Sequence, residues 1–375
     1  MKTNILILGG GLQALSTAYS LWKEGIYAVC LADKEEEIRQ SRFIKRFYPQ
    51  QKGKIYEQIL AIIQSEQIGL IIPMSDYFSE LLSKHNVELE SEYNCHVPVP
   101  NHEIFIQGAD KEKLMAFCEQ NGFPHPRTRA LNATNIEEVA QYVQFPALIK
   151  PNRSVGARGI KLVHSLDELK RDYPVIYKTY GDATLQEYVD SKDAPYYNVM
   201  LYRSKNGQII GSAIIEILRF FPIKGGSSSL CRTIEAPELK DICEKVLHKL
   251  NWEGMADFDV LKAPDGEYKI IEINPRVPAS LRAADIAGVN FPMIMLEQEH
   301  YIPTSYKVNQ YLRYFGLDIM WFLSSPNRFK ANPAWFFSIG RNVYFQDIYA
   351  KDPSTWFSWL INGFKRFIHK RKHIQ

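Results

Sequence analysis

The sequence predicts two fold classes in one chain: a doubly wound α/β region and then an antiparallel α+β region, followed by an aromatic and basic helical extension. At the start, an apolar strand, a glycine turn, an amphipathic helix and a second strand follow one another, which is the order of a doubly wound α/β unit. From residue 145 onward, short β segments alternate with glycine turns, a pattern typical of antiparallel sheets. Beyond residue 302 the chain is rich in aromatic residues.

Length and composition predict a soluble globular protein of two or three domains. The chain has 375 residues, too many for one ordinary domain, and its net charge of +3 gives no reason to expect a nucleic-acid partner. Its five cysteines are scattered and none forms a C-x-x-C pair, so we expect a reducing cytoplasm and neither a disulfide framework nor a zinc site. We expect no signal peptide, and no apolar run approaches the ~18 to 20 residues of a membrane span.

The first strand ends in a glycine turn that superficially matches a dinucleotide-binding fingerprint. Gly9, Gly10 and Gly11 precede a helix, and Asp33 ends the next strand. The third fingerprint glycine is missing, because residues 12–14 contain no glycine. Any strand-to-helix connection of an α/β fold can use such a turn. An NAD-dependent oxidoreductase therefore stays an open alternative.

A second parallel strand and a domain boundary follow. The apolar run 68–73 predicts a strand that ends beside Ser75 and Asp76, and ligands of such sheets bind beyond the carboxyl ends of the strands. Near Gly108 the pattern changes to a helix over residues 111–120. This change indicates the end of the first domain.

Lys150 ends the apolar segment PALIK and precedes a glycine-bearing loop, residues 153–159. A lysine charge on one side and free amide groups on the other could hold the phosphates of ATP. The loop is no Walker A motif, because no G-K-[ST] follows its glycines. An exposed hairpin with a surface lysine is the alternative interpretation.

A hairpin near residue 270 carries the segment IIEINPR. Alternation with period two places Glu272, Asn274 and Arg276 on one face of a strand, and Asp259 on the paired strand can lie beside them. Two carboxylates and a carboxamide oxygen are ligands that Mg²⁺ prefers when it also binds phosphates. Arg276 would face the transferring phosphoryl group. A polar face in solvent is the alternative, although it explains Pro275 less well.

Five ordered motifs resemble the ATP-grasp superfamily, as in biotin carboxylase and the carbamoyl phosphate synthetase large chain, from the start of the chain to about residue 300. In that family a Rossmann-like pre-domain precedes a D-K helix, a V-P-x-T-like segment, K-x-x-x-x-G-x-x-G, a hinge like Q-E-Y-[IV], and E-[IM]-N-[PT]-R. The corresponding segments here are Asp110-Lys111, Pro124 to Thr128, Lys150 to Gly159, Gln186 to Val189, and Glu272 to Arg276.

The resemblance implies a domain for each part of the chain and a ligand for each motif. It implies a Rossmann-like pre-ATP-grasp domain (1–109), an ATP-grasp fold made of a small lid subdomain (110–190) and a large subdomain with the metal site (191–302), and a C-terminal extension (303–375). The residues that would bind ATP are Lys111, Lys150, Ser154, Gly156, Ala157, Arg158, Gly159, Gln186, Glu187, Tyr188, Val189 and Asp193. Asp259, Glu272 and Asn274 would hold Mg²⁺, which Mn²⁺ could replace. Asp259 stands where the family often has Glu.

A further segment looks like the substrate-side loop of a carboxylate-amine ligase branch of this family. Arg219 and Arg232 lie on either side of its glycine and serine run and could clamp a carboxylate or phosphate, so they join Arg276 and Lys150 as candidate catalytic residues. Surface arginines without this role are the alternative. The chain has no biotin-accepting motif, glutaminase sequence or second ATP-grasp copy, which disfavours a carboxylase or a complete carbamoyl phosphate synthetase.

The C-terminal segment predicts a membrane-surface helix. From Ser354 to His373, a helix would gather an apolar stripe of Trp356, Leu360, Phe364, Phe367 and Ile368, flanked by Lys365, Arg366, Lys370 and Arg371. Such a helix suits an anionic leaflet. The alternative is a helix docked on the protein body, and Gly363 weakens either helix by up to about 1 kcal/mol.

These observations predict an ATP-dependent carboxylate-amine ligase that forms an acyl phosphate, then an amide or peptide-like bond, and releases ADP and phosphate. Its carboxylate and amine could be small molecules or lipid-linked, and the chain could form a homodimer. We expect it in the cytoplasm, or at the inner face of the membrane. A non-catalytic ATP-binding or membrane-associated scaffold protein is the alternative from another class.

Overall fold

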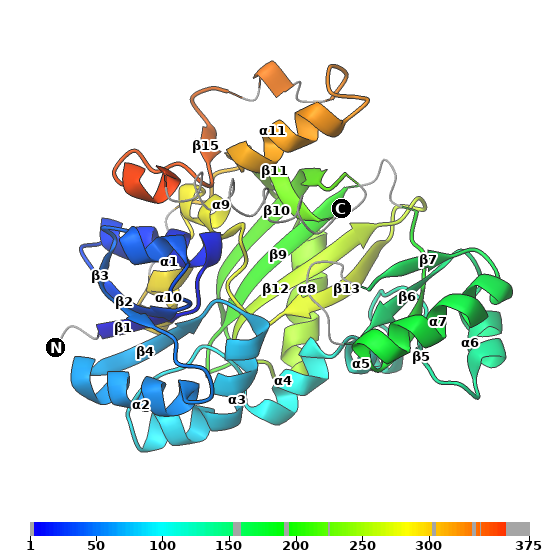
Figure 1. The fold of residues 1–375 in the computed structure, drawn as a ribbon, viewed down its shortest axis with the longest axis horizontal. Helices are drawn as coiled ribbons and strands as arrows, with labels where there is room; N and C mark the ends of the chain where they lie inside the picture. Colours follow the sequence, from blue (N-terminus) through cyan, green and yellow to red (C-terminus); the bar gives the residue numbers. More distant parts are fainter. Residues whose placement is uncertain are drawn as a thin grey trace, which may run out of the picture.

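The computed structural model describes residues 4–152, 159–190, 195–223, 226–301, 305–331, 335–337 and 339–357. Three sheets carry the fold of these residues. A parallel sheet at the N-terminal end, a central and mainly antiparallel sheet, and a smaller sheet follow one another across the molecule (Figure 1). In the described residues, no helix is long and apolar enough to cross a membrane.

The N-terminal domain is the predicted Rossmann-like unit. Its four strands are parallel and lie in the order β3-β2-β1-β4. Strands β1, β2 and β4 are almost continuous apolar runs, because helices cover both faces of a parallel sheet. The elements are β1 (Asn4–Leu8), α1 (Gly11–Lys23), β2 (Ala28–Ala32), η1 (Glu37–Gln40), β3 (Ile44–Pro49), α2 (Ile55–Glu66), β4 (Ile68–Pro73), α3 (Asp76–Ser91) and α4 (His102–Ala109).

A small antiparallel sheet and three helices make up residues 111–187, which we call the lid. Its strand order is β5-β8-β6-β7. The elements are α5 (Lys111–Asn121), β5 (Thr128–Leu131), α6 (Ile136–Val143), β6 (Ala147–Pro151), β7 (Lys161–Val163), α7 (Leu166–Tyr180) and β8 (Ala183–Glu187). The predicted helix 111–120 is confirmed, and it ends at Gly122, whose φ of 69° is the left-handed conformation that glycine adopts without steric cost.

The central sheet has seven strands in the order β13-β12-β9-β10-β11-β14-β15. Its elements and those packed on it are β9 (Tyr196–Arg203), β10 (Ile209–Phe221), β11 (Ser227–Ile234), α8 (Pro237–Leu250), β12 (Gly254–Lys262), β13 (Tyr268–Asn274), α9 (Leu281–Ile286), α10 (Phe291–Glu297), η2 (Gln298–His300), β14 (Tyr311–Arg313), α11 (Phe315–Ser324), η3 (Trp335–Phe337) and β15 (Val343–Phe345). Strands β14 and β15 come from the predicted C-terminal extension. This part of the extension therefore completes the edge of the sheet and is no separate appendage.

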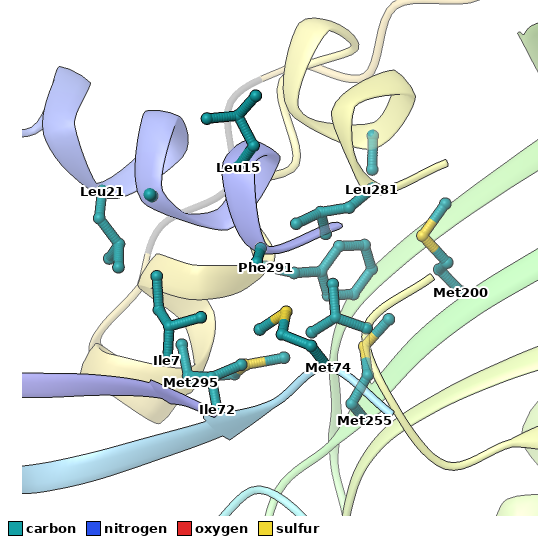
Figure 2. Packing of buried hydrophobic residues seen from close by; sticks show 14 of the residues in the cluster. Ile7, Leu15, Leu21, Ile72, Met74, Met200, Met255, Leu281, Phe291 and Met295 are labelled. Carbon is teal, nitrogen blue, oxygen red and sulfur yellow. The ribbon is translucent and has the colours of Figure 1, made fainter. Parts of the chain in front are cut away.

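The N-terminal domain and the central sheet share one hydrophobic core. Side chains from β1 and β4 meet Met200 and Met255 of the central sheet, with α1, α9 and α10 between them. Figure 2 shows the Phe291 ring of α10 near Met74 and Leu281 at the centre of this contact. Such close packing fixes the parallel sheet relative to the antiparallel one. The loop at the carboxyl end of β4 is thereby held beside the end of the hairpin β12–β13.

The residues after β15 return to the N-terminal domain. Tyr349 is buried, its hydroxyl lies 3.0 Å from Ser16 Oγ, and its ring contacts those of Tyr19 and Phe43. Asp352 Oδ2 accepts hydrogen bonds from Ser41 Oγ at 2.7 Å and from the Arg42 amide at 3.0 Å. Residues 353–357 are helical, and the remainder of the predicted helix 354–373 lies outside the described residues.

Two details of the predicted hairpin are wrong. Strand β13 ends at Asn274, so Arg276 follows the strand and does not lie on its face. A register shift between Asp259 and Val260 also changes the alternation, because Glu272 pairs with the first and Ile270 with the second. As a result Ile270 and Ile273 pack in one core cluster, although strict alternation would place these two residues on opposite faces of the strand.

Candidate active site

Three neighbouring strands bring polar side chains to one face of the central sheet. Asp259 on β12 lies opposite Glu272 on β13 and opposite Asn198 on β9, and Asp257 lies opposite Asn274. The intervening residues of β12 are apolar and pack on the other face of the sheet. Asn198 Nδ2 donates to Asp259 Oδ1, and Asn274 Nδ2 lies 3.4 Å from Asp259 Oδ2. The predicted metal ligands are therefore brought together.

The carboxyl groups of Asp257, Asp259 and Glu272 differ in their pKa values. Burial raises the pKa of Asp259 well above its usual range, and the charges of Glu272 and Asp257 raise it further. Burial, with a contribution from Glu272, also raises the pKa of Asp257, to about 7, although Arg276 opposes this. For Glu272, burial acts upward, but the Lys111 ammonium and the hydrogen bond with Asp259 outweigh it and lower the pKa to about 2. The raised pKa values mean that the carboxyl cluster of Asp257, Asp259 and Glu272 lacks enough neighbouring positive charge to keep all three groups ionised.

The donor set fits a divalent cation. Asp257 is 1% exposed, and its Oδ1 has no hydrogen-bond partner within the described residues. Leaving a buried carboxylate oxygen without a partner is costly, and a bound cation would remove that cost. Asp259, Glu272 and Asn274 supply further oxygen atoms of the kind that Mg²⁺ and Mn²⁺ prefer.

Lys111 is the first residue of α5 and reaches the carboxyl cluster. Asp110 caps this helix, because its Oδ1 accepts from the amides of Glu112 at 3.0 Å and Lys113 at 3.2 Å. The Lys111 side chain then extends to Glu272, with Nζ 2.8 Å from Oε2. Of the Asp110-Lys111 pair, the aspartate therefore caps the helix and the lysine places its charge at the site.

Lys150 lies in the middle of the lid sheet. Strand β6, which carries it, pairs with β7 and β8, and Lys150 is 6% exposed. Its Nζ donates to Gln186 Oε1, and Gln186 Nε2 donates to Thr128 Oγ1 at 3.0 Å. Burial lowers the pKa of Lys150 to about 8, the Lys111 charge acts in the same direction, and Glu272 and Asp259 oppose it. The two lysines and the carboxyl cluster therefore share one electrostatic environment.

The predicted hinge follows directly from β8. The Glu187 amide donates to Arg127 O at 2.8 Å, while its carboxylate accepts from the Arg127 amide at 3.0 Å. Tyr188 N donates to Pro146 O at 3.2 Å. Val189 is buried. These hydrogen bonds hold the backbone of this segment against the lid. The Glu187 carboxylate is bound by Arg127 of the protein itself.

Some predicted ATP-binding residues cannot be placed. Ser154, Gly156, Ala157, Arg158 and Asp193 lie outside the described residues. Gly159, which ends the loop, is described and has a φ of 76°, and a Cβ there would overlap the Tyr180 ring and Pro151. Only glycine suits that position.

Arg276 connects the hairpin to the N-terminal domain. Its Nε lies 2.9 Å from Asp76 Oδ1, at the carboxyl end of β4, and its Nη2 donates to Asn274 Oδ1 at 3.1 Å. The side chain of Arg276 is 22% exposed. This guanidinium therefore borders the carboxyl cluster and keeps access to solvent.

Arg219 and Arg232 are not part of this cluster. Arg219 is buried, its Nη1 lies 3.1 Å from Asp318 Oδ1, and it stacks on Trp321 of α11. Arg232 pairs across the sheet with Glu216, with Nε 2.5 Å from Oε2. Glu216 lies opposite Tyr197, which packs on the face away from Asn198. The sequence could not reveal that each arginine has a partner within the fold.

Sequence reasoning missed four residues at the site: Asp257, Asn198, Tyr196 and Asp76 as the partner of Arg276. Tyr196 is hydrogen-bonded to Asp259. One signal was available for Asn198, because it is the only polar uncharged amide in the apolar strand segment YYNVMLY. Asp257 offered another, since it precedes Asp259 by two residues and so shares its face.

The glycine turn has a different environment from that of a dinucleotide site. The Gly11 amide donates to Glu36 Oε2 at 2.8 Å, and a Cβ at Gly10 would overlap the Glu36 carboxylate. A carboxylate thus stands where a phosphate would approach the start of α1. A cavity of about 190 Å³ beside this turn is lined partly by Glu36, Tyr314 and Asp347, and none of its lining residues belongs to the carboxyl cluster.

The sheets and this site define a class of ATP-dependent enzyme, and comparison with known proteins gives its family. Residues 108–280 match the ATP-grasp domain family, a range that contains both lysines and the whole hairpin. Residues 108–280 are therefore an ATP-grasp domain. One similar solved structure, the biotin carboxylase domain of the Hydrogenobacter thermophilus 2-oxoglutarate carboxylase, is a complex with ADP and magnesium.

The chain is similar to several characterised ATP-grasp proteins. It is 22% identical over 342 residues to the D-aspartate ligase of Enterococcus faecium, covering 81% of this chain and 79% of the relative. It is 26% identical over 287 residues to the carbamoyl phosphate synthase large chain of Methanosphaerula palustris, covering 72% of this chain but only 26% of that protein.

Solved structures share the fold. The biotin carboxylase of Campylobacter jejuni superimposes with a TM-score of 0.69 at 18% identity, covering 82% of this chain and 74% of the other. The N5-carboxyaminoimidazole ribonucleotide synthetase of Thermotoga maritima gives a TM-score of 0.62 at 17% identity, covering 83% and 79%. These similarities confirm the predicted fold class, a Rossmann-like domain followed by an ATP-grasp fold.

Proposed function

We propose that this protein joins a carboxylate to an amine through an acyl phosphate. The observation that carries the proposal is the convergence of Lys111 and Lys150 with Asp257, Asp259 and Glu272 where the lid meets the central sheet. Two cations beside a carboxyl cluster suit a metal-bound polyphosphate, in which negative charge must be neutralised from both sides.

The proposed reaction proceeds in two displacement steps. A carboxylate oxygen of the substrate attacks the γ-phosphorus of ATP, the bond from that phosphorus to the β-phosphate oxygen breaks, and ADP leaves. The amine nitrogen then attacks the acyl carbon, phosphate leaves, and the nitrogen loses a proton. Positioning and charge neutralisation account for most of the catalysis of phosphoryl transfer.

Each charged residue has a proposed part in this reaction. Lys111 and Lys150 bind phosphate oxygens, and Asp259, Glu272 and Asn274 hold Mg²⁺ or Mn²⁺. When bound, the metal ion would neutralise the charge that develops during phosphoryl transfer. Arg276 steadies the acyl phosphate. We assign no substrate contact to Arg219 or Arg232, because Asp318 and Glu216 already bind them.

The remaining predicted ATP contacts stay part of the proposal. The loop Ser154 to Gly159 would close over the phosphates, the backbone of Glu187 to Val189 would bind adenine, and Asp193 would bind the ribose. The hydrogen bonds that hold Glu187 and Tyr188 against the lid support the hinge, since a fixed backbone can present the same groups to each adenine.

The substrate class rests on chemistry and on similarity. Arg276 offers a planar guanidinium suited to a carboxylate or an acyl phosphate. The D-aspartate ligase among the relatives is named for an amino acid, and we propose an amino acid or a similarly small acid as the carboxylate. The biotin carboxylase domain of the Hydrogenobacter thermophilus 2-oxoglutarate carboxylase is a dimer, which supports a homodimer here.

Release of ADP tests the proposal. Purified protein with Mg²⁺ and ATP should release ADP only when a suitable carboxylate is present, and an amine should raise the rate. Lys150→Ala and Glu272→Ala should each lower the rate by about 100-fold or more. Lys161→Ala, an exposed lysine on β7, is the matched control and should keep wild-type activity. Unchanged turnover in the first two variants would refute the assignment.

We also propose that the protein works at a membrane surface with a lipid-linked substrate. The sequence from Ser354 to His373 supports this, because basic residues flank an apolar stripe. A scaffold protein without activity would bind vesicles and ATP but release no ADP with any carboxylate. A thermal-shift comparison of ATP with NAD(P)H distinguishes the ligase and the scaffold protein, which bind ATP, from an oxidoreductase, which binds NAD(P)H.

A further inference from the structure

The outer side of α11 and the segment after it carry several exposed large apolar side chains within a short stretch of the described residues. Leu323 is 66% exposed, Phe329 68%, Phe336 58% and Ile339 66%. Met320, one turn before Leu323 and on its side of the helix, is also exposed. We call the described side chains of Met320, Leu323, Phe329 and Phe336 the apolar surface. Exposed apolar clusters of this kind mark sites that bind a protein or a membrane.

The apolar surface stands on a fixed base. Arg219 and Arg313 both bind Asp318, whose Oδ1 and Oδ2 lie 3.1 Å and 2.6 Å from them, so the inner side of α11 is tied to β10 and β14. Trp335 Nε1 donates to Asp318 O at 3.1 Å and anchors η3 to the same helix. Figure 1 shows α11 at an outer edge of the molecule, beside β11 and far from the lid.

Aromatic contacts then position the exposed rings. Phe322 contacts Trp335, Phe329 and Phe336, with ring centroids 4.7, 5.6 and 5.6 Å apart. Phe329 and Phe336 stack on each other at 6.4 Å, yet both remain more than half exposed. The anchored residues Trp335 and Phe322 therefore hold two phenyl rings at the surface, which is an arrangement built into the fold.

The chain segment that carries the apolar surface has charges of one sign. Between Ile319 and Phe345 the sequence contains Arg328, Lys330 and Arg341 and no acidic residue. Arg328 lies over the rings of Phe322 and Phe329, with its Cζ 5.9 and 5.5 Å from their centroids. Residues 358–375, which lie outside the described part of the chain, contain five lysines and arginines and no acid. A binding partner that complements this region would therefore be both apolar and anionic.

We infer that the apolar surface docks on an anionic phospholipid bilayer. Phenyl and leucine side chains enter the acyl boundary while lysine and arginine remain at the headgroups. Each basic residue adds electrostatic attraction to anionic lipid. A second copy of the chain is a poorer partner, because face-to-face pairing would bring Arg328 and Lys330 against the same charges. The inference rests on the membrane association proposed above and names a surface outside residues 354–373.

Vesicle binding by the full-length chain tests this inference. Wild-type protein should sediment with vesicles of phosphatidylcholine mixed with phosphatidylglycerol, much less with phosphatidylcholine alone, and less as salt screens the attraction. Leu323→Glu and Phe329→Glu should each weaken binding by about tenfold or more. Both side chains are solvent-exposed, so the variants should fold, which their thermal unfolding checks. Val87→Glu, at a 71% exposed position on α3, is the matched control and should bind as wild type.

Three outcomes would overturn the inference, and they have different meanings. If wild-type protein binds no anionic vesicles, the membrane association also fails. If it binds and the Leu323 and Phe329 variants bind equally well, the contact lies elsewhere, as in residues 358–375. If the two variants instead abolish a concentration-dependent dimer in the absence of lipid, the surface pairs two copies. ADP release measured without vesicles tests the ligase proposal independently.

Discussion

Lys111 at the start of α5 forms an ion pair with Glu272 on β13, with Nζ 2.8 Å from Oε2. Both residues are assigned to Mg·ATP, one to phosphate and one to metal. In this structure they neutralise each other, and the lysine lowers the pKa of the carboxyl group to about 2. Binding of Mg·ATP would place the metal ion on Glu272 and phosphate on Lys111, so the ion pair holds both side chains ready at their positions.

Replacing Lys111 with methionine should weaken ATP binding by about tenfold or more, because a charge-assisted contact to phosphate is lost. It should also lower the stability of the protein without ligand by about 1 to 3 kcal/mol, since Glu272 would then lie beside Asp259 without its cation. Titration calorimetry and chemical unfolding measure the two effects. Lys113→Met, two residues along α5 and exposed, is the control. Equal effects of the two substitutions would contradict the assignment of Lys111.

The affinity for ATP should fall as the pH rises through about 8, the pKa to which burial lowers Lys150. Phosphate beside the side chain favours the ammonium form, so binding takes up a proton above this pH. The contribution of Lys150 to folding has the opposite sign. Between pH ~8 and ~10.4 the unfolded chain keeps a proton that the folded chain has lost, and stability from this group rises with pH.

The dissociation constant of ATP, measured from about pH 7 to about pH 9.5, tests this dependence. Lys150→Arg keeps its charge throughout that range and should bind ATP with a much flatter profile. If the arginine variant follows the same pH dependence as the wild type, another group is responsible.

The hairpin site could be predicted from the sequence because its residues lie close together along the chain. Glu272 and Asn274 lie two residues apart on one strand, and Asp259 lies on the strand joined to it by a short turn, so period two is enough to bring them together. Arg219 shows the limit of such reasoning. Its partner Asp318 is 99 residues away, and no local pattern predicts that pair. The role of the extension as two strands of the central sheet was missed for the same reason.

Asp318 is fully buried between Arg219 and Arg313, and its removal should destabilise the protein strongly. Asp318→Ala leaves two buried guanidinium groups without their shared carboxylate, which costs about 3 to 5 kcal/mol. Asp265→Ala, in the exposed turn of the hairpin, removes one hydrogen bond from the Glu267 amide and should cost about 1 kcal/mol or less. Denaturant unfolding measures both. A small effect at Asp318 would mean that α11 is held by its apolar contacts alone.

Asp76 should act on the reaction through Arg276, whose Nε lies 2.9 Å from Asp76 Oδ1. Asp76→Asn keeps the shape but removes the charge that orients the guanidinium, so kcat/KM for the carboxylate substrate should fall by about tenfold. The dissociation constant of ATP should change little, because Lys111 and Lys150 are untouched. Asp76→Glu restores the charge and should recover part of the activity. Glu80→Gln, one turn further along α3, controls for the loss of a surface charge. If Asp76→Asn weakens ATP binding as much as it slows the reaction, Asp76 supports the whole site and has no specific effect on Arg276.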